Sequence, residues 1–469
     1  MSQVTTQRSS LLSSIREAVM GNTHRDFTEE RIGRAITLLA IPMVLEMMME
    51  SLFAVVDMFW VAHLGANAVA TVGFTEALLM LIYTVALGLS VATAATVARR
   101  IGEKEPQAAA ETAAQAIMLG AIIAIAIGVS GAIFAPQLLT LMGASPAVVA
   151  VGSGYARAIF GGSGTVMLLF LINAVFRGAG DASLAMRVLW TANLINIALN
   201  PLLIFGIGPF PRLGVTGSGI GTTIGRGIGV LLQLWMLTNS WSRVVVHARE
   251  FRVRPALMLK LLRLSLGGML QYFVGTSSWI LLIRMTAPFG STVIAGYTIM
   301  LRIILFALLP SWGMASAAAT LVGQNLGAKK PERAESAVWR AGFYNMILLG
   351  AVAVLFIAFA RQLVGIFTAD EAVAQVAANA LRIISSGYVF YAWGMVAIQA
   401  FNGAGDTVTP TLINLFCFWA CQLPIAWWLA FHTPMRSNGI FAAIAISQSL
   451  IAIIGMLAFR RGKWKLQKV

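Results

Sequence analysis

Residues 68–98 read AVATVGFTEALLMLIYTVALGLSVATAATVA, an uninterrupted run in which Glu76 is the one charged side chain. The hydrocarbon core of a bilayer is about 30 Å thick, so a helix rising about 1.5 Å per residue needs about 20 apolar residues to cross it. This run exceeds that length. It therefore predicts a membrane-spanning helix.

The rest of the 469-residue chain has the same character, being 58% hydrophobic and 11% charged overall. Soluble domains are usually about 45–50% apolar and about 25% charged. Twelve spans are predicted, at roughly 36–62, 68–98, 109–135, 148–174, 184–205, 215–238, 260–285, 293–322, 336–360, 373–400, 410–431 and 439–459. Open sheet edges facing lipid would leave backbone groups unpaired, so no strands are expected. The sequence predicts an all-α polytopic membrane protein.

Basic residues are concentrated on one side of the predicted spans. The loops of one side hold Arg212, Arg361 and Arg436. Most of the chain's 33 Lys and Arg fall on the other side, chiefly in the N-terminal arm 1–33, the linker 239–259 and the tail 460–469. Cytoplasmic loops carry such an excess, so we expect both termini in the cytoplasm. The net charge of +15 then reflects topology, and no nucleic-acid partner is expected.

The two halves of the chain repeat at a constant offset in residue number. FRGAGD at 176–181 recurs as FNGAGD at 401–406, and Gly102, Lys104 and Pro106 recur at the same offset as Gly327, Lys329 and Pro331. Six helices per repeat is an even number, so both repeats have the same topology. We predict an N-lobe (34–238) and a C-lobe (260–459), related by a pseudo-two-fold axis along the membrane normal. Transporters built from such repeats place their site between or within the two bundles.

Four of the 18 acidic residues lie well inside predicted spans, namely Glu46, Glu50, Asp57 and Glu76. A charge in the bilayer core is costly, so such groups normally face a cavity or a partner. Glu50 lies about one helical turn after Glu46, and Asp57 lies about three turns after Glu46. These three acids therefore share one helix face, which we expect to point into the N-lobe. A carboxylate sheltered there suits reversible proton uptake. The alternative is a polar stripe paired with arginines such as Arg157 or Arg226.

Polar side chains of other N-lobe spans fall at a similar depth. They are Asn196 and Asn200 in the fifth span and Ser218 and Thr222 in the sixth, at the level of Asp57 and Glu76. Oxygen ligands suit hard cations or a proton relay. Ordinary hydrogen bonds between membrane helices are the alternative interpretation.

Five motifs together resemble the multidrug and toxic compound extrusion (MATE) family of transporters. They are VVDMFWVAHLG (55–65), FRGAGD (176–181), NIALNPLLIFG (196–206), GVTGSGIGTTIGR (214–226) and FNGAGD (401–406). The resemblance runs from about residue 32 to 460. It implies twelve helices in two six-helix lobes, and a cation-coupled antiporter, driven by Na⁺ or H⁺, that exports amphipathic and often cationic drugs.

The resemblance also assigns site residues. The family's first-helix acid falls on Asp57, its Asn-x-x-x-Asp-Pro on Asn196, Asn200 and Pro201, and its sixth-helix threonine on Thr222. The second acid is here Asn200, which removes a formal charge from a Na⁺ site formed by Asp57, Asn196 and Asn200. Asp57 is then the main titrating group.

A second branch of the family uses acids in helices seven and ten. Here 260–285 and 373–400 contain none. Coupling is therefore expected in the N-lobe, with Glu76 assisting and Glu46 and Glu50 as secondary acids.

The two GAGD turns have a structural interpretation. Gly178, Gly180, Gly403 and Gly405 turn the chain, and Asp181 and Asp406 are expected to cap the helices that follow. We also expect these turns to take part in gating between the lobes.

The sequence thus predicts a secondary antiporter of the inner (plasma) membrane, monomeric, with H⁺ or Na⁺ as coupling ion and no cofactor. A flippase for lipid-linked sugars from the same superfamily is the main alternative, although the predicted spans hold few cations. An enzyme is not indicated, because GxSxG, HExxH and P-loop motifs are absent from the sequence. The N-terminal arm is either an interfacial helix or a disordered tail.

Overall fold

The computed structural model describes residues 11–21 and 25–467, and within these residues all regular secondary structure is helical. Eleven helices are long and apolar enough to cross a membrane, or twelve when the bent pair α14–α15 is counted as one span. The prediction of an all-α polytopic membrane protein is confirmed.

The N-lobe consists of α2 to α9. Its elements are α2 (Ile32–Ala62), α3 (Ala66–Gly102), α4 (Pro106–Ile133), the short α5 (Ala135–Leu141), α6 (Pro146–Gly161), α7 (Ser163–Ala179), α8 (Ala182–Phe205) and α9 (Val215–Thr238). A linker containing the 3₁₀ helix η1 (Ala248–Phe251) follows.

The C-lobe consists of α10 to α18. Its elements are α10 (Pro255–Thr286), η2 (Ala287–Phe289), α11 (Ser291–Gly327), α12 (Pro331–Ala358), α13 (Ala360–Gly365), α14 (Glu371–Ser385), α15 (Tyr388–Ala404), α16 (Val408–Asn414), the π-helix η3 (Leu415–Gln422), α17 (Leu423–His432) and α18 (Ser437–Arg460), before a last 3₁₀ turn, η4 (Lys463–Leu466).

The internal repeat is visible in the helix bounds themselves. In the helix pairs α3 and α11, α4 and α12, and α7 and α15, the first and last residues of both helices differ by the same offset that separates the two GAGD turns. The two lobes therefore build equivalent helices from equivalent positions, as the sequence repeat predicts.

Three predicted spans are less regular than expected. The fourth is broken into α6 and α7 at Gly162, where a Cβ atom would lie 2.3 Å from the Thr223 hydroxyl of α9. The tenth is broken into α14 and α15, which meet at a bend of 59°. The eleventh contains the π-helix η3, a distortion often found at functional sites.

The arm before the first span contains helix α1 (Leu11–Met20), so the described part of the arm is folded. It is tied to the N-lobe by an ion pair between Glu17 and Arg34 at 2.9 Å and by a hydrogen bond of 3.0 Å from Arg187 to the Val19 carbonyl. Residues 1–10 lie outside the described residues.

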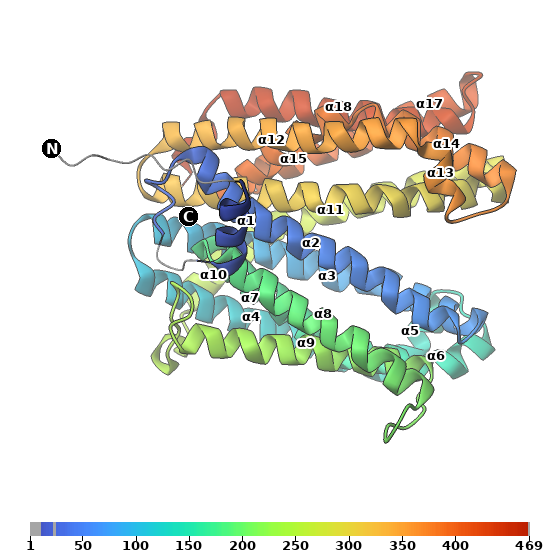
Figure 1. The fold of residues 1–469 in the computed structure, drawn as a ribbon, viewed down its shortest axis with the longest axis horizontal. Helices are drawn as coiled ribbons and strands as arrows, with labels where there is room; N and C mark the ends of the chain where they lie inside the picture. The colour runs from blue at the N-terminus through green and yellow to red at the C-terminus, as the bar shows by residue number, and fades with distance from the viewer. Residues whose placement is uncertain (1–10, 22–24, 468–469) are drawn as a thin grey trace.

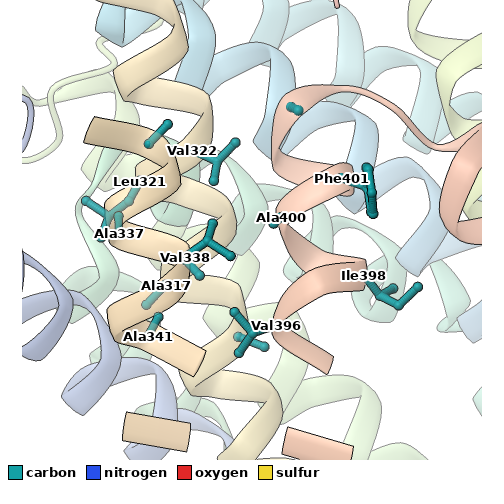
Figure 2. Close-up of a cluster of buried hydrophobic side chains, with 14 of the residues drawn as sticks. Ala317, Leu321, Val322, Ala337, Val338, Ala341, Val396, Ile398, Ala400 and Phe401 are labelled. Atoms are coloured by element: carbon teal, nitrogen blue, oxygen red, sulfur yellow. The ribbon is translucent and has the colours of Figure 1, made fainter. Parts of the chain in front are cut away.

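The lobes converge at one end of the molecule and diverge toward the other (Figure 1). We call the convergent end the basic end, because it carries the turns at 103–105 and 328–330 with their flanking Arg and Lys. An apolar cluster of the C-lobe fills the space between α11, α12 and α15, with Leu321, Val338 and Phe401 among its members (Figure 2). Residues of α2 such as Leu39 belong to the same cluster, so it also joins the lobes.

Candidate ion and substrate site

The three acids of α2 point into the N-lobe, as their spacing predicts. Glu46 is 1% exposed. Its Oε1 accepts hydrogen bonds from Asn173 at 3.0 Å and from Arg177 at 2.8 Å, both on α7. Glu46 is thus held by a buried ion pair.

Glu50 also has a basic partner. Its carboxylate accepts a hydrogen bond from Asn193 of α8 at 3.1 Å and lies 3.4 Å from the Arg226 guanidinium of α9. Arg226 in turn donates to the Tyr83 hydroxyl at 3.2 Å. For Glu46 and Glu50, the polar stripe paired with arginines is the arrangement that the structure contains.

Asp57 has different surroundings. Its Oδ1 accepts hydrogen bonds from the Asn200 amide and, at 2.9 Å, from the Ser218 hydroxyl. No basic side chain in residues 11–21 and 25–467 forms an ion pair with it. Asp57 is therefore the acid of α2 whose charge is held by neutral donors.

Two amide oxygens of α8, those of Asn200 and of Asn196 one helical turn earlier, lack hydrogen-bond partners within the described residues. Asn196 is 2% exposed and donates to the Thr222 hydroxyl at 2.8 Å, while Asn200 is fully buried. The Oδ1 atoms of both amides are buried and unpartnered. A buried acceptor without a donor is costly, so these two oxygens are available to a cation or its water. These oxygen atoms, together with the Asp57 carboxylate, fit Na⁺, which prefers oxygen ligands.

Glycines of α9 let the helices α8 and α9 approach each other closely at this site. A Cβ atom on Gly221 would lie 2.3 Å from the Asn200 Oδ1, and one on Gly225 would lie 2.7 Å from the Ala192 carbonyl of α8. Gly217, one turn earlier, meets the Leu203 backbone at 2.6 Å in the same way. Small residues spaced by one helical turn let membrane helices approach closely. This spacing positions Asn196 and Asn200 against α9.

Glu76 stands apart from this cluster. Its side chain is exposed, and among the described residues it has no hydrogen bond or ion pair. Met80, one helical turn later on α3, lines the space between the lobes, so Glu76 lies on the side of α3 that faces the C-lobe.

A cavity of about 350 Å³ lies between the lobes. Most of its lining is apolar or aromatic, including Met47, Phe170 and Trp312. Glu50 and Arg177 bring one charge of each sign to its wall. The cavity is therefore suited to amphipathic molecules.

The GAGD turns lie at the contact between the lobes. Gly180 and Gly405 end α7 and α15 in the left-handed conformation, with φ of +90° and +85°. Two C-lobe side chains reach the first turn, since Thr320 donates to the Arg177 carbonyl at 3.1 Å and Gln324 to the Gly178 carbonyl at 3.0 Å.

The expected helix capping is found at one turn and not at the other. Asp406 accepts a hydrogen bond from the Thr409 amide at 3.0 Å, as predicted. The prediction for Asp181 is wrong, because its side chain makes no capping bond to α8. It accepts hydrogen bonds instead from the Ser242 hydroxyl at 2.6 Å and the Arg243 amide at 2.8 Å. Asp181 thus holds the start of the linker, which follows the first repeat and has no counterpart after the second.

Comparison with known proteins places this architecture. The model of the MatE family matches residues 42–202 and 268–428, most of both halves. The chain belongs to the MATE family.

Relatives and solved structures agree with this MATE assignment. The probable multidrug resistance protein YoeA of Bacillus subtilis is 24% identical over 445 residues, which cover 93% of this chain and 95% of YoeA. A MOP superfamily transporter from Pyrococcus furiosus superposes with a TM-score of 0.88 at 26% identity, covering 94% of this chain and 98% of its own. An outward-facing multidrug resistance MATE transporter superposes with a TM-score of 0.87 at 26% sequence identity, with the same coverage of both chains. MATE proteins are transporters and not enzymes.

Several partners in this MATE site were missed by sequence reasoning. Asn193 precedes Asn196 and Asn200 at helical spacing, and that spacing could have revealed it. Asn173 gave no such signal. Arg177 stands in the last turn of α7, beside the first GAGD turn, yet its long side chain reaches back to Glu46.

Proposed function

We propose that this chain is a cation-coupled multidrug antiporter of the plasma membrane, with both termini in the cytoplasm. Asp57 is the coupling group, and H⁺ or Na⁺ bound beside it is exchanged for an amphipathic or cationic molecule in the central cavity. The observation that carries the proposal is the Asp57 carboxylate, free of any basic ion-pair partner in the described chain and hydrogen-bonded to Asn200. The Oδ1 atoms of Asn200 and of Asn196, one helical turn away, are buried and unpartnered.

The site's electrostatics support ion exchange. Because only amide and hydroxyl donors hold Asp57, gain or loss of a positive charge there leaves no arginine unpaired. The ion and the drug favour opposite arrangements of the lobes, so the binding of one promotes the release of the other. One charge crossing about 100 mV is worth about 2.3 kcal/mol, enough to drive useful export.

The cavity supports the substrate class. Aromatic and thioether side chains such as Trp312 and Met47 offer apolar contact to flat amphipathic molecules. A flippase for sugar pyrophosphates would need a strongly basic cavity, whereas Arg177 is paired here with Glu46.

The proposal is tested with purified protein in liposomes. Efflux of an ethidium-type cationic dye is followed under separate Na⁺ and H⁺ gradients for the wild type and for Asp57→Asn. The amide keeps the shape and loses the charge, so we expect gradient-driven efflux to fall to the protein-free rate while the variant elutes as a folded monomer. Gradient-driven transport at the wild-type rate in Asp57→Asn would remove Asp57 from the mechanism.

The ion preference is tested by Asn200→Asp. A second carboxylate at this position adds negative charge next to Asp57, and hard cations bind more tightly as ligand charge increases. We expect stronger dependence of efflux on the Na⁺ gradient, measured as a lower half-maximal Na⁺ concentration. An unchanged value would contradict the placement of Asn200 beside the ion.

A further inference from the structure

The outer parts of α3 and α11 each carry one charge. Before Arg99, Glu76 is the one charged residue of α3, and Arg302 is the one charged residue of α11. The two helices have equivalent bounds in the internal repeat, and Arg302 is the counterpart of Ala77. Glu76 and Arg302 therefore stand at nearly the same depth, one position apart, or about 1.5 Å of helical rise.

The two helices meet at the basic end. A Cβ atom on Gly102 would lie 2.0 Å from the Gln324 carbonyl oxygen, and one on Gly327 would lie 2.2 Å from the Arg99 carbonyl oxygen. Toward the other end the lobes diverge (Figure 1). Gly73, on the same helix as Glu76, would meet nothing within 4 Å if it carried a Cβ atom. The helices α3 and α11 thus form a V with its apex at the basic end.

Glu76 and Arg302 lie on the separated arms of this V. Both side chains are exposed, and neither has a hydrogen bond or an ion pair within the part of the chain that the structure describes. Met80, one helical turn after Glu76, and Leu305, one turn after Arg302, both line the cavity between the lobes, so the two charges lie on the cavity-facing sides of their helices. Glu76 therefore lies in the cleft between the lobes rather than against lipid.

Closure of the outer end would change the surroundings of both charges. If the lobes rock so that the basic end opens, the outer arms of α3 and α11 approach each other and water leaves the cleft. An unpaired charge buried there would be strongly unfavourable, whereas two opposite charges at one depth can neutralise each other.

We propose that Glu76 and Arg302 form an interlobe ion pair that closes the outer end when the basic end is open. The pair makes Glu76 a gate residue for the closed state rather than a ligand of the ion at Asp57. This inference rests on the alternating access of the proposed function.

Proximity is tested first, by a cysteine pair that needs neither substrate nor ion. Cys417 and Cys421, the chain's two cysteines, are replaced by Ser, and Glu76→Cys is combined with Arg302→Cys. We expect a disulfide under mild oxidation, detected by mass spectrometry of the linked peptides. Its yield should rise when Gly102→Ala is added, because the new methyl group pushes the basic end open.

The matched control is Leu81→Cys with Arg302→Cys. Leu81 is 60% exposed and lies on another face of α3, so this pair should give little disulfide in either background. Absence of the Glu76–Arg302 disulfide in both backgrounds, or equal yields from the two pairs, would overturn the gate.

The charges are tested by exchange. Glu76→Gln and Arg302→Gln should each lower the dye efflux rate by about fivefold, which corresponds to the lower end of typical coupling free energies between sites. The double variant Glu76→Arg with Arg302→Glu restores opposite charges and should recover efflux to within about twofold of the wild type, as coupled pairs do in double-mutant cycles. No recovery, together with intact folding, would contradict the pair.

The two proposals fail separately. If Asp57→Asn abolishes gradient-driven efflux, and the double variant with exchanged charges at 76 and 302 does not recover the wild-type rate, the ion site is supported and the gate is contradicted. If the wild type moves no dye under any gradient, the proposed function falls, and the disulfide experiment still decides whether the outer arms meet.

Discussion

Asp57 differs from Glu46 and Glu50 in what balances its charge. The two glutamates lie 2.8 and 3.4 Å from guanidinium groups, whereas the described partners of Asp57 are an amide and a hydroxyl. An acid paired with a buried arginine cannot be neutralised without leaving that arginine unpaired. We therefore expect the two glutamates to stabilise the N-lobe, and this difference supports Asp57 as the ion-exchanging acid of the proposed function.

This difference predicts unequal losses of folding stability for two similar substitutions. Glu46→Gln leaves Arg177 without its partner, and breaking a buried pair costs about 3–5 kcal/mol, so we expect a clear drop in Tm and little monomeric protein. Asp57→Asn, its matched control, leaves no buried cation unpaired and should unfold close to the wild type. Thermal unfolding in detergent, followed by size-exclusion chromatography, measures both. Equal Tm values for the two variants would contradict the assignment.

At the scale of single elements, spacing predicted much of the structure, and contact between elements decided the rest. The face shared by Glu46, Glu50 and Asp57 followed from helical periodicity alone. The break at Gly162 did not, and the need for a glycine there comes from Thr223 of α9, far along the chain, which a Cβ atom would hit. Likewise the two GAGD turns are almost identical in sequence, but Asp181 binds the linker. Local pattern cannot supply such long-range partners.

The α8–α9 contact predicts an effect of single methyl groups. Gly221→Ala places a Cβ atom 2.3 Å from the Asn200 Oδ1, so either α9 or the amide must move, and coupled efflux should fall by about tenfold or more for a displacement of about 1 Å. Gly227→Ala, on the same helix, would meet Thr165 at an ordinary 3.6 Å and should be close to wild type. Liposome efflux rates at equal protein levels compare the two variants. Equal rates would show that α8 and α9 tolerate separation at the site.

For the whole molecule, the basic end is closed by close backbone contact together with side-chain hydrogen bonds between the lobes. Gly102 and Gly327 let α3 and α11 touch, and the hydrogen bond from Gln324 to Gly178 joins the first GAGD turn to the C-lobe. The structure is closed at this end, and we expect that closure to depend on the glycines that let α3 and α11 approach.

That closure can be weakened without touching the ion site. Gly102→Ala puts a Cβ atom 2.0 Å from the Gln324 carbonyl oxygen, and backbone atoms cannot give way as a flexible side chain can. We expect the population to shift toward a state open at the basic end. Spin labels at Lys104→Cys and Lys329→Cys, in a background without Cys417 and Cys421, should report a longer distance between the lobes. Gly73→Ala, in open space on the same helix, is the control and should match the wild type. An unchanged distance distribution in Gly102→Ala would mean that the contact between α3 and α11 does not hold the basic end closed.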